Sequence, residues 1–260
     1  MNWFQILFLS AVQGLTEFLP ISSSGHLVLF QQLFGLSQPM IFFDVLLHIG
    51  TLFAIFFYFR QDLLKLLNGI LKKEKSSLKI LWLLILGSLP AAAFGFLFEK
   101  QINDVFNSLI LLGISFLLTG LLLFSTIFIK DSKNIDIAKG KWFDAILIGF
   151  FQAIAILPAI SRSGSTIVSG LWRGFSKEEA FRFSFFLAIP AILGALLLET
   201  KSATQFSSLQ LFQGLIGMVV AGVVGYLSLA LLQRVLKSKK IWIFGIYCSI
   251  LGLIILLFNL

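Results

Sequence analysis

Long apolar runs alternate with short polar segments along most of the chain. Six runs approach the length of about 20 residues that a helix needs to cross the hydrocarbon core of a bilayer. They cover residues 41–59, 80–98, 107–129, 181–198, 209–232 and 241–259. Two further apolar regions, 3–36 and 142–175, are each interrupted near the middle by polar residues. The pattern predicts an all-α protein with about six full transmembrane helices.

Composition supports this class of protein. Of the 260 residues, 58% are hydrophobic and 12% are charged, and the mean hydropathy is +0.98. Soluble domains carry roughly 25% charged residues. We therefore interpret the chain as an integral membrane protein.

The basic residues predict how the chain crosses the membrane. Most of the 20 Lys and Arg residues fall in the four segments 60–79, 130–141, 173–182 and 234–240. The positive-inside rule places these segments in the cytoplasm. The loops 99–104 and 199–208, with one Lys each, are then expected on the outer side.

With this sidedness, region 142–175 begins and ends on the cytoplasmic side, and region 3–36 on the outer side. About 34 residues at a rise of about 1.5 Å each are few for two crossings of a core of about 30 Å. Each region therefore predicts a re-entrant helical hairpin, with tips near Ser22–Gly25 and Ser161–Ser165. We expect one membrane domain, 1–260, built from inverted repeats of about 1–130 and 140–260, as in transporters whose broken helices meet near the midplane.

The net charge of +8 needs no nucleic-acid partner, because the cytoplasmic loops account for it. The basic segment 60–79 also contains leucines at helical spacing. It is either a short interfacial helix against anionic lipid or an ordinary cytoplasmic loop.

The two interruptions carry the candidate chemistry. They read QGLTEFLPISSSGH (13–26) and LPAISRSGST (157–166). Gln13 and Glu17 share one helix face and offer oxygen ligands for Mg²⁺ or Ca²⁺. Arg162 is a permanent cation whose donor fork suits phosphate. His26, three residues after Ser23, is a candidate general base or nucleophile partner.

Hydroxyls and backbone N–H groups of Ser/Gly turns can form an anion-binding nest. The residues that supply them are Ser22, Ser23, Ser24, Gly25, Ser161, Ser163, Gly164 and Thr166. Together with Arg162 and Glu17, these groups suit a phosphate or pyrophosphate at membrane depth, and hence a lipid phosphate.

Several of these residues also have a purely structural interpretation. Arg162 and Glu17 could form an ion pair that only stabilises the bundle, and single serines often serve close helix packing. An ionisable side chain at membrane depth is nevertheless a functional candidate by default. His48 and Asp44, spaced i, i+4, are either a second layer around the site or a structural polar contact.

The two motifs resemble those of the undecaprenyl-pyrophosphate phosphatase family, also called the bacitracin-resistance type. Its first motif is matched by Gln13, Glu17, Ser22, Ser23, Gly25 and His26. Its second motif, Pro-Gly-x-Ser-Arg-Ser-x-x-Thr, is matched by Pro158, Ser161, Arg162, Ser163 and Thr166. Ala159 stands where the family usually has Gly, which leaves less room for the turn.

The resemblance implies a hydrolase that removes the terminal phosphate of a C55 isoprenyl pyrophosphate and so recycles the carrier lipid for peptidoglycan and other envelope polysaccharides. It also implies a divalent cation, a location in the bacterial plasma membrane and a site that faces the extracytoplasmic side. We expect Gln13 and Glu17 to hold the metal and Arg162 to clamp the pyrophosphate. Ser23 or a metal-bound water attacks, with His26 as acid–base partner.

The main alternative is a flippase or transporter of a polyprenyl phosphate, since inverted repeats and a midplane polar site are also transporter features. A lipid phosphatase of the phosphatidate type would need an Arg-Pro dipeptide, and the sequence contains none. The nucleophile, the metal, the preferred lipid length and the oligomeric state, a homodimer included, are left open.

Overall fold

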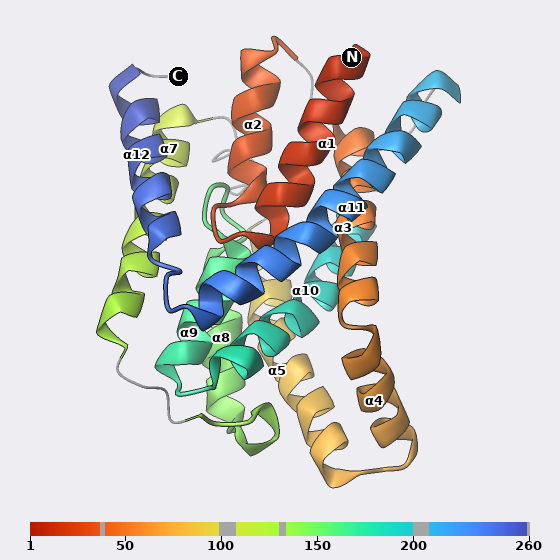
Figure 1. The fold of residues 1–260 in the computed structure, drawn as a ribbon, viewed down its shortest axis with the longest axis vertical. Coiled ribbons are helices and arrows are strands. Elements are labelled where there is room, and N and C mark those ends of the chain that lie inside the picture. The colour runs from red at the N-terminus through yellow and green to blue at the C-terminus, as the bar shows by residue number, and fades with distance from the viewer. Residues whose placement is uncertain (37–39, 99–107, 130–133, 200–207, 259–260) are drawn as a thin grey trace.

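The chain folds almost entirely into helices in the computed structural model, which describes residues 1–36, 40–98, 108–129, 134–199 and 208–258. They are α1 (Trp3–Phe18), α2 (Ser23–Leu33), α3 (Ile41–Tyr58), α4 (Arg60–Leu71), α5 (Lys75–Leu97), α7 (Leu109–Phe124), α8 (Trp142–Ile154), α9 (Arg162–Trp172), α10 (Lys177–Glu199), α11 (Ser208–Lys237) and α12 (Ile243–Phe258) (Figure 1). Two short 3-10 helices, η1 (Ser125–Phe128) and η2 (Ile137–Lys139), lie between α7 and α8. The described part of each of the six predicted spans lies on one long helix, with η1 continuing α7, and each interrupted region lies on a pair of helices.

Membrane character is confirmed by the lengths and surfaces of these helices. Among the described helices, α5, α7 together with η1, α10 and α11 are each long and apolar enough to cross a bilayer. The pair α3–α4 qualifies as one unit that bends by 74°, and α8 and α12 are apolar but shorter. Large apolar side chains remain uncovered, such as Phe96 at 78% and Phe128 at 82% exposure. A surface of this kind suits contact with lipid rather than water.

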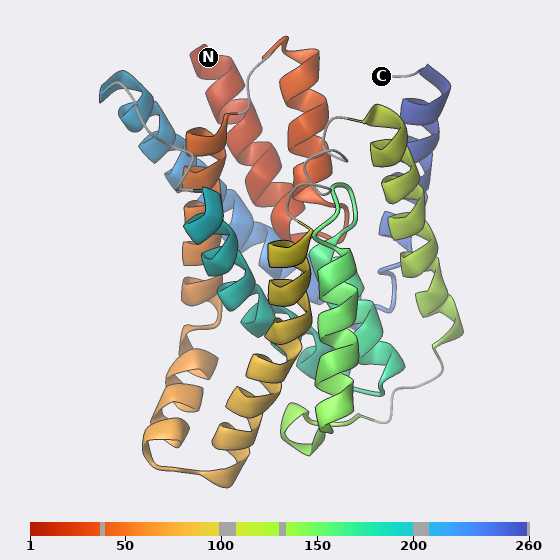
Figure 2. The same ribbon diagram turned by 180° about the vertical axis from the view of Figure 1, so that it is seen from behind.

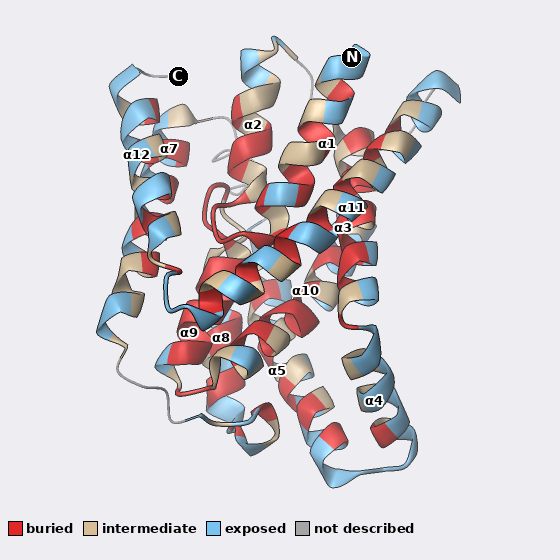
Figure 3. Ribbon diagram, in the orientation of Figure 1, coloured by how far each residue is buried: buried red, intermediate tan, exposed pale blue. Residues whose placement is uncertain are grey.

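The basic segment 60–79 is helical, which favours its interpretation as a short helix over that as an ordinary cytoplasmic loop. It contains α4 and the first turns of α5, joined by a tight turn in which Lys73 has a φ of +56°. The outward face of α4 is largely exposed (Figure 3). Its position relative to a bilayer stays a prediction.

Two hairpins enter the bundle from opposite ends (Figures 1 and 2). The open end of α1–α2 lies at the end of the molecule that holds both termini. The open end of α8–α9 lies at the other end, beside α5, and both tips reach the middle. The predicted hairpin geometry is therefore confirmed. The repeat boundaries near 130 and 140 stay a prediction, because 130–133 lie outside the described residues.

The described parts of the four basic segments, the second only from residue 134 on, lie in the half of the molecule opposite the termini (Figure 1). The Lys177 ammonium donates to the Lys237 carbonyl oxygen at 3.0 Å, and the Arg182 guanidinium lies 3.8 Å from the Asp62 carboxylate. A β-bridge joins Ile135 to the turn between α9 and α10. This clustering agrees with the predicted cytoplasmic face. The predicted outer loops, 99–104 and 199–208, lie almost entirely outside the described residues.

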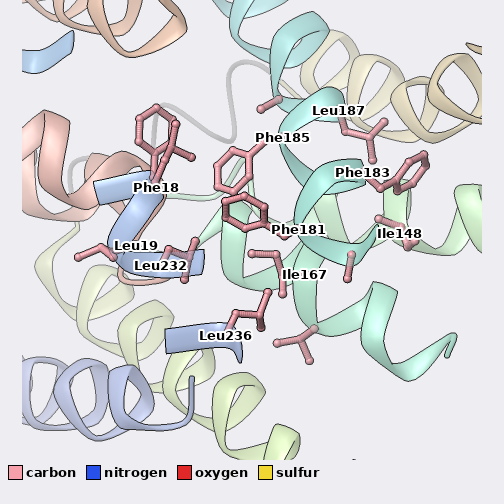
Figure 4. Packing of buried hydrophobic residues seen from close by; sticks show 14 of the residues in the cluster. Phe18, Leu19, Ile148, Ile167, Phe181, Phe183, Phe185, Leu187, Leu232 and Leu236 are labelled. Atoms are coloured by element: carbon pink, nitrogen blue, oxygen red, sulfur yellow. The ribbon is translucent and has the colours of Figure 1, made fainter. Parts of the chain in front are cut away.

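An apolar core fixes the hairpin tips in the centre (Figures 3 and 4). The ring of Phe18, at the end of α1, meets the ring of Phe185 on α10 edge to face with centroids 5.5 Å apart. The ring centroids of Phe185 and Phe181 lie 4.8 Å apart. Leu19 and Ile167, from the two hairpins, belong to the same buried cluster. Buried rings of this size contribute much of the packing energy.

Glycines allow each hairpin to pack closely against a long helix. Gly149 of α8 lies against Gly87 of α5, where a side chain on Gly149 would overlap the Gly87 carbonyl oxygen. In the other hairpin, a Cβ on Gly14 of α1 would lie 2.5 Å from the carbonyl oxygen of Ala221 on α11. Such close backbone contacts are typical of packing inside membranes. They leave the hairpins little freedom to shift along the neighbouring helices.

Candidate active site

The first tip is a turn that begins helix α2. Pro20 follows the end of α1, and Ser22 then adopts a φ of +67° and caps α2. The Ser22 hydroxyl oxygen accepts from the Gly25 N–H at 3.5 Å and lies 3.2 Å from the Ser24 hydroxyl. A hydroxyl at the N-cap satisfies a helix N–H that has no partner within the helix.

The second tip repeats this cap. The Ser161 hydroxyl oxygen accepts from the Gly164 N–H at 3.1 Å and lies 3.2 Å from the Ser163 hydroxyl. Ala159 has a φ of +62° and is fully buried. A left-handed backbone favours glycine, which gives a physical reason why the family usually has glycine at the position of Ala159. Room is less of a constraint, because the methyl group of Ala159 lies against the bare backbone of Gly25.

The two tips meet at Glu17, whose side chain is 7% exposed. Its Oε1 accepts from Arg162 Nη2 at 2.7 Å, and its Oε2 accepts from the Ser23 hydroxyl at 2.6 Å. The amide of Gln13 donates to the same Oε2 at 3.2 Å. The structure thus joins four of the predicted residues, from both hairpins, around one buried carboxylate.

Two buried polar atoms of this cluster have no hydrogen-bond partner in the described part of the chain. They are Nη1 of Arg162, a cationic donor, and Oε1 of Gln13, a neutral acceptor. Leaving such groups unpaired is unfavourable. The unpaired Nη1 of Arg162 could donate to an anion, and the unpaired Oε1 of Gln13 could bind a cation, both beside the Glu17 carboxylate.

The helix ends strengthen the preference for an anion. α2 begins at Ser23 and α9 begins at Arg162, so both helices direct their N-terminal N–H groups toward the meeting point of the tips. Helix N-termini carry partial positive charge and bind phosphate readily. A pyrophosphate at this junction would meet two such ends and the Arg162 guanidinium.

His26 is directed toward α12. Its Nδ1 lies 2.6 Å from the Ser22 carbonyl oxygen, and its Nε2 lies 2.6 Å from the Tyr247 hydroxyl. The two rings stack with an interplanar angle of 8°. Both ring nitrogens are therefore engaged, and neither pairs with Ser23. This arrangement favours Glu17 over His26 as the acid–base partner of Ser23.

Other predicted residues hold the tips together. The Ser163 hydroxyl donates to the Leu19 carbonyl oxygen at 3.4 Å, which links the two hairpins. The Thr166 hydroxyl lies 2.6 Å from that of Ser184 on α10. The substrate-binding roles predicted for Ser22, Ser24, Gly25, Ser161, Ser163, Gly164 and Thr166 stay predictions.

His48 lies beside the cluster, as the second-layer interpretation expects. Its Nε2 is 3.9 Å from Oε2 of Glu17, and its Nδ1 contacts the Asp44 carbonyl oxygen at 2.8 Å. The Asp44 carboxylate accepts from Gln31 at 3.0 Å. Both sequence interpretations therefore hold in part, since His48 makes a structural contact and also faces the site.

Three residues at the tips were missed by sequence reasoning. Thr119 of α7 bonds the Ala159 carbonyl oxygen at 2.9 Å, Tyr247 bonds His26, and Ser184 bonds Thr166. Each is one hydroxyl within a long apolar run, where nothing local distinguishes it from a packing residue.

A divalent cation would find few ligands here without substrate. In the described ranges, no three His, Cys, Asp or Glu side chains gather closely enough to hold a metal. The unpartnered Oε1 of Gln13 and the carboxylate of Glu17 are nevertheless hard oxygen donors. Mg²⁺ is commonly held by one or two carboxylates together with substrate phosphates. The residues fit a cation that arrives with, or is completed by, a phosphate ligand.

Comparison with known proteins agrees with this geometry. Residues 6–254 match the family model of bacitracin resistance protein BacA. The chain belongs to the BacA family. Its relatives include the undecaprenyl-diphosphatase of Alkaliphilus metalliredigens, with 39% identity over 100% of both chains. That of Carboxydothermus hydrogenoformans is 42% identical over 98% of this chain and 97% of the relative. The predicted family resemblance is confirmed, and the match includes both tips.

Proposed function

We propose that this chain is an undecaprenyl-diphosphatase that removes the terminal phosphate of undecaprenyl pyrophosphate. The product, undecaprenyl phosphate, is reused as the carrier lipid of envelope-polysaccharide synthesis. The observation that carries the proposal is the contact of Arg162 and Ser23 with opposite oxygens of Glu17. Membership of the BacA family over nearly the whole chain supports it.

The pyrophosphate is held by the groups that the tips leave unpaired. Nη1 of Arg162 donates to a phosphate oxygen while Nη2 stays on Glu17, so that one guanidinium fork bridges protein and substrate. The N–H groups at the start of α2 and α9 face the remaining phosphate oxygens. Charge-assisted bonds of this kind are stronger than neutral ones.

Ser23 is the nucleophile in this scheme, and Glu17 is its base. Oε2 of Glu17 takes the hydroxyl proton, Oγ bonds to the terminal phosphorus, and the bond from that phosphorus to the bridging oxygen breaks. The electron pair stays on the bridging oxygen, and undecaprenyl phosphate leaves. Water then displaces Oγ from phosphorus, Glu17 returns its proton to Oγ, and both hydrogens of the water leave on inorganic phosphate.

Gln13 and Glu17 are the residues that would hold a divalent cation, Mg²⁺ or Ca²⁺. When bound, the cation supplies positive charge that neutralises the pyrophosphate. The unpartnered Oε1 of Gln13 supports this part of the proposal. Its amide nitrogen already donates to Glu17, so the side-chain oxygen is the atom of Gln13 left to bind a ligand.

The active site is proposed to open toward the extracytoplasmic side of the bacterial plasma membrane. The described parts of the basic segments lie in the half of the molecule opposite the termini, and the α1–α2 hairpin opens toward the end that holds the termini (Figure 1).

The test is phosphate release from a C55 or C15 isoprenyl pyrophosphate by the purified protein in detergent. It is run with and without Mg²⁺ or Ca²⁺, beside Ser23→Ala. Metal-dependent release that the variant loses supports the proposal, as does a phosphoserine at residue 23 trapped by acid quench and identified by mass spectrometry. A folded protein that binds the lipid and releases no phosphate would favour a polyprenyl-phosphate flippase instead.

A further inference from the structure

Each tip contains one residue in the left-handed region that is not glycine. Ser22 has a φ of +67° and Ala159 a φ of +62°. Such residues persist only where the surrounding structure determines their conformation, and they are typical of functional sites. Ser22 immediately precedes Ser23, the first residue of α2, and Ala159 lies three residues before Arg162, the first residue of α9. What holds these two turns therefore sets the geometry of the site.

In the first tip the turn is held by a chain of hydrogen bonds that ends on α12. A carbonyl oxygen only accepts, so His26 Nδ1 carries the hydrogen that goes to Ser22 at 2.6 Å. Nε2 of the neutral ring must then accept, and the Tyr247 hydroxyl donates to it at 2.6 Å. Tyr247 thereby fixes the imidazole tautomer that grips the Ser22 carbonyl. The neighbouring Cys248 thiol also contacts the tip, 3.8 Å from the Pro20 carbonyl oxygen.

In the second tip the corresponding contact comes from α7. The Thr119 hydroxyl donates to the Ala159 carbonyl oxygen at 2.9 Å and accepts from the Ser161 N–H at 3.2 Å. All three residues are buried. A single side chain thus bonds both sides of the left-handed turn, directly before Arg162.

The two holding residues emerge from one close helix crossing. A Cβ on Gly120 of α7 would lie 3.0 Å from the Gly245 carbonyl oxygen of α12, and a Cβ on Gly245 would lie 3.0 Å from the Gly120 carbonyl oxygen. Thr119 is next to the first glycine, and Tyr247 is two residues after the second. In terms of the predicted repeats, the last helix of each one holds the tip of the other.

We propose that Thr119 and Tyr247 are positioning residues for the phosphatase reaction, which fix the two tips so that Ser23 and Arg162 meet on Glu17. His26 belongs to the same device, because it transmits the contact from Tyr247 to the Ser22 carbonyl. The inference rests on the proposed function. It gives a positioning role to α7 and α12, which contribute no residue to the hydrogen-bonded cluster around Glu17.

The first experiment compares Tyr247→Phe and Thr119→Val with matched variants that lose the same hydroxyl elsewhere. Tyr226→Phe alters a tyrosine of α11 that is about as exposed as Tyr247. Thr126→Val alters a threonine whose hydroxyl donates to the Leu123 carbonyl oxygen within its own helical turn. Phosphate release from a C15 isoprenyl pyrophosphate with Mg²⁺ gives kcat and KM, and the unfolding midpoint in the same detergent is measured for each variant.

For both tip variants we expect kcat to fall roughly 10- to 100-fold, the effect typical of residues that orient a reacting group, while KM changes by less than about threefold. Arg162 and the helix ends still bind the pyrophosphate, so binding is affected less than chemistry. Thr119→Ser, which keeps the hydroxyl, should restore most of kcat. Values of kcat that match the control variants would overturn the inference.

A second comparison separates a positioning role of His26 from an acid–base role. The side-chain amide of His26→Asn reaches the place of Nδ1, whereas that of His26→Gln reaches the place of Nε2. If His26 acts through Ser22, Asn preserves more kcat than Gln, and adding Tyr247→Phe to His26→Asn lowers kcat no further. The opposite order, or an unchanged effect of Tyr247→Phe in the Asn variant, would refute the chain of contacts.

The two proposals can fail separately. A folded wild-type protein that releases no phosphate contradicts the proposed function. An active wild type in which Tyr247→Phe and Thr119→Val are also fully active contradicts only the positioning role. If Tyr247→Phe does not survive purification, the comparison of Thr119→Ser with Thr119→Val tests the positioning role. Both side chains fit the space of Thr119, and only serine keeps its hydroxyl.

Discussion

Replacing Arg162 tests whether its ion pair with Glu17 only stabilises the fold or also takes part in catalysis. The Arg162 and Glu17 side chains are 15% and 7% exposed, and they meet at 2.7 Å. Arg162→Ala leaves the Glu17 carboxylate buried without its cation. Removing one partner of a buried pair typically destabilises a protein by about 3–5 kcal/mol. At about 2–4 °C per kcal/mol for a chain of this size, the midpoint of unfolding should fall by about 6–20 °C.

The double variant Glu17→Gln/Arg162→Ala removes both charges together. A neutral amide can still accept from the Ser23 hydroxyl and from Gln13, and replacing both members of a buried pair is often nearly neutral. We therefore expect most of the lost stability to return. Phosphate release should not return, because the base for Ser23 and the donor for the pyrophosphate are both absent.

The assay combines thermal unfolding, followed by tryptophan fluorescence in detergent, with phosphate release well below the lowest midpoint. Arg173→Ala is the matched control. It breaks the ion pair in which Arg173 Nε lies 2.6 Å from the Asp144 carboxylate, which is 6% exposed. This pair lies at the open end of the α8–α9 hairpin, away from the tip. This variant should lose stability and keep its activity. A double Glu17/Arg162 variant that recovers activity along with stability would refute the reasoning, since the pair would then be merely structural.

Three further predictions concern the same elements. Ser23→Ala should lower phosphate release by at least about a hundredfold, whereas Ser24→Ala keeps most of it, and equal losses would contradict Ser23 as the nucleophile. Gly149→Ala should lower the unfolding midpoint by the equivalent of about 1–3 kcal/mol, because its Cβ would overlap the backbone of α5. Gly194→Ala, with open space around its Cβ, should leave the midpoint unchanged or raise it. Chelation of divalent cations should abolish release, and Gln13→Ala should raise the Mg²⁺ concentration that restores half of it; an unchanged requirement would remove Gln13 from the metal site.

The helices could be predicted from the sequence because an apolar segment at membrane depth has to satisfy its own backbone. Their ends could not. The run predicted at 80–98 belongs to a helix that begins at Lys75, and the run at 209–232 to one that continues to Lys237. Hydropathy marks the part of a helix that contacts hydrocarbon, whereas the polar turns beyond it are stabilised by packing and capping.

The centre of the site could be predicted because charge is conspicuous in an apolar chain. Glu17 and Arg162 differ from everything around them, and they pair across 145 residues. Thr119 and Tyr247 do not differ in this way, since a hydroxyl in a helix can bond its own backbone. The spacing of Ser23 and His26 suggested a catalytic pair, but spacing does not say which neighbours a side chain faces. That information lies in the crossing of α7 and α12, which no local pattern encodes.

The two tips share one capping arrangement and differ in one decisive position. Ser22 and Ser161 both cap the helix that follows, and the hydroxyl of each lies 3.2 Å from that of the serine two residues later. The residue after the cap is Ser23 in one tip and Arg162 in the other, and these two contact opposite oxygens of Glu17. A symmetric scaffold thus presents a nucleophile and a cation to the same carboxylate from two sides. The proposed chemistry depends on this difference, because two identical tips would supply two hydroxyls without a clamp, or two clamps without a nucleophile.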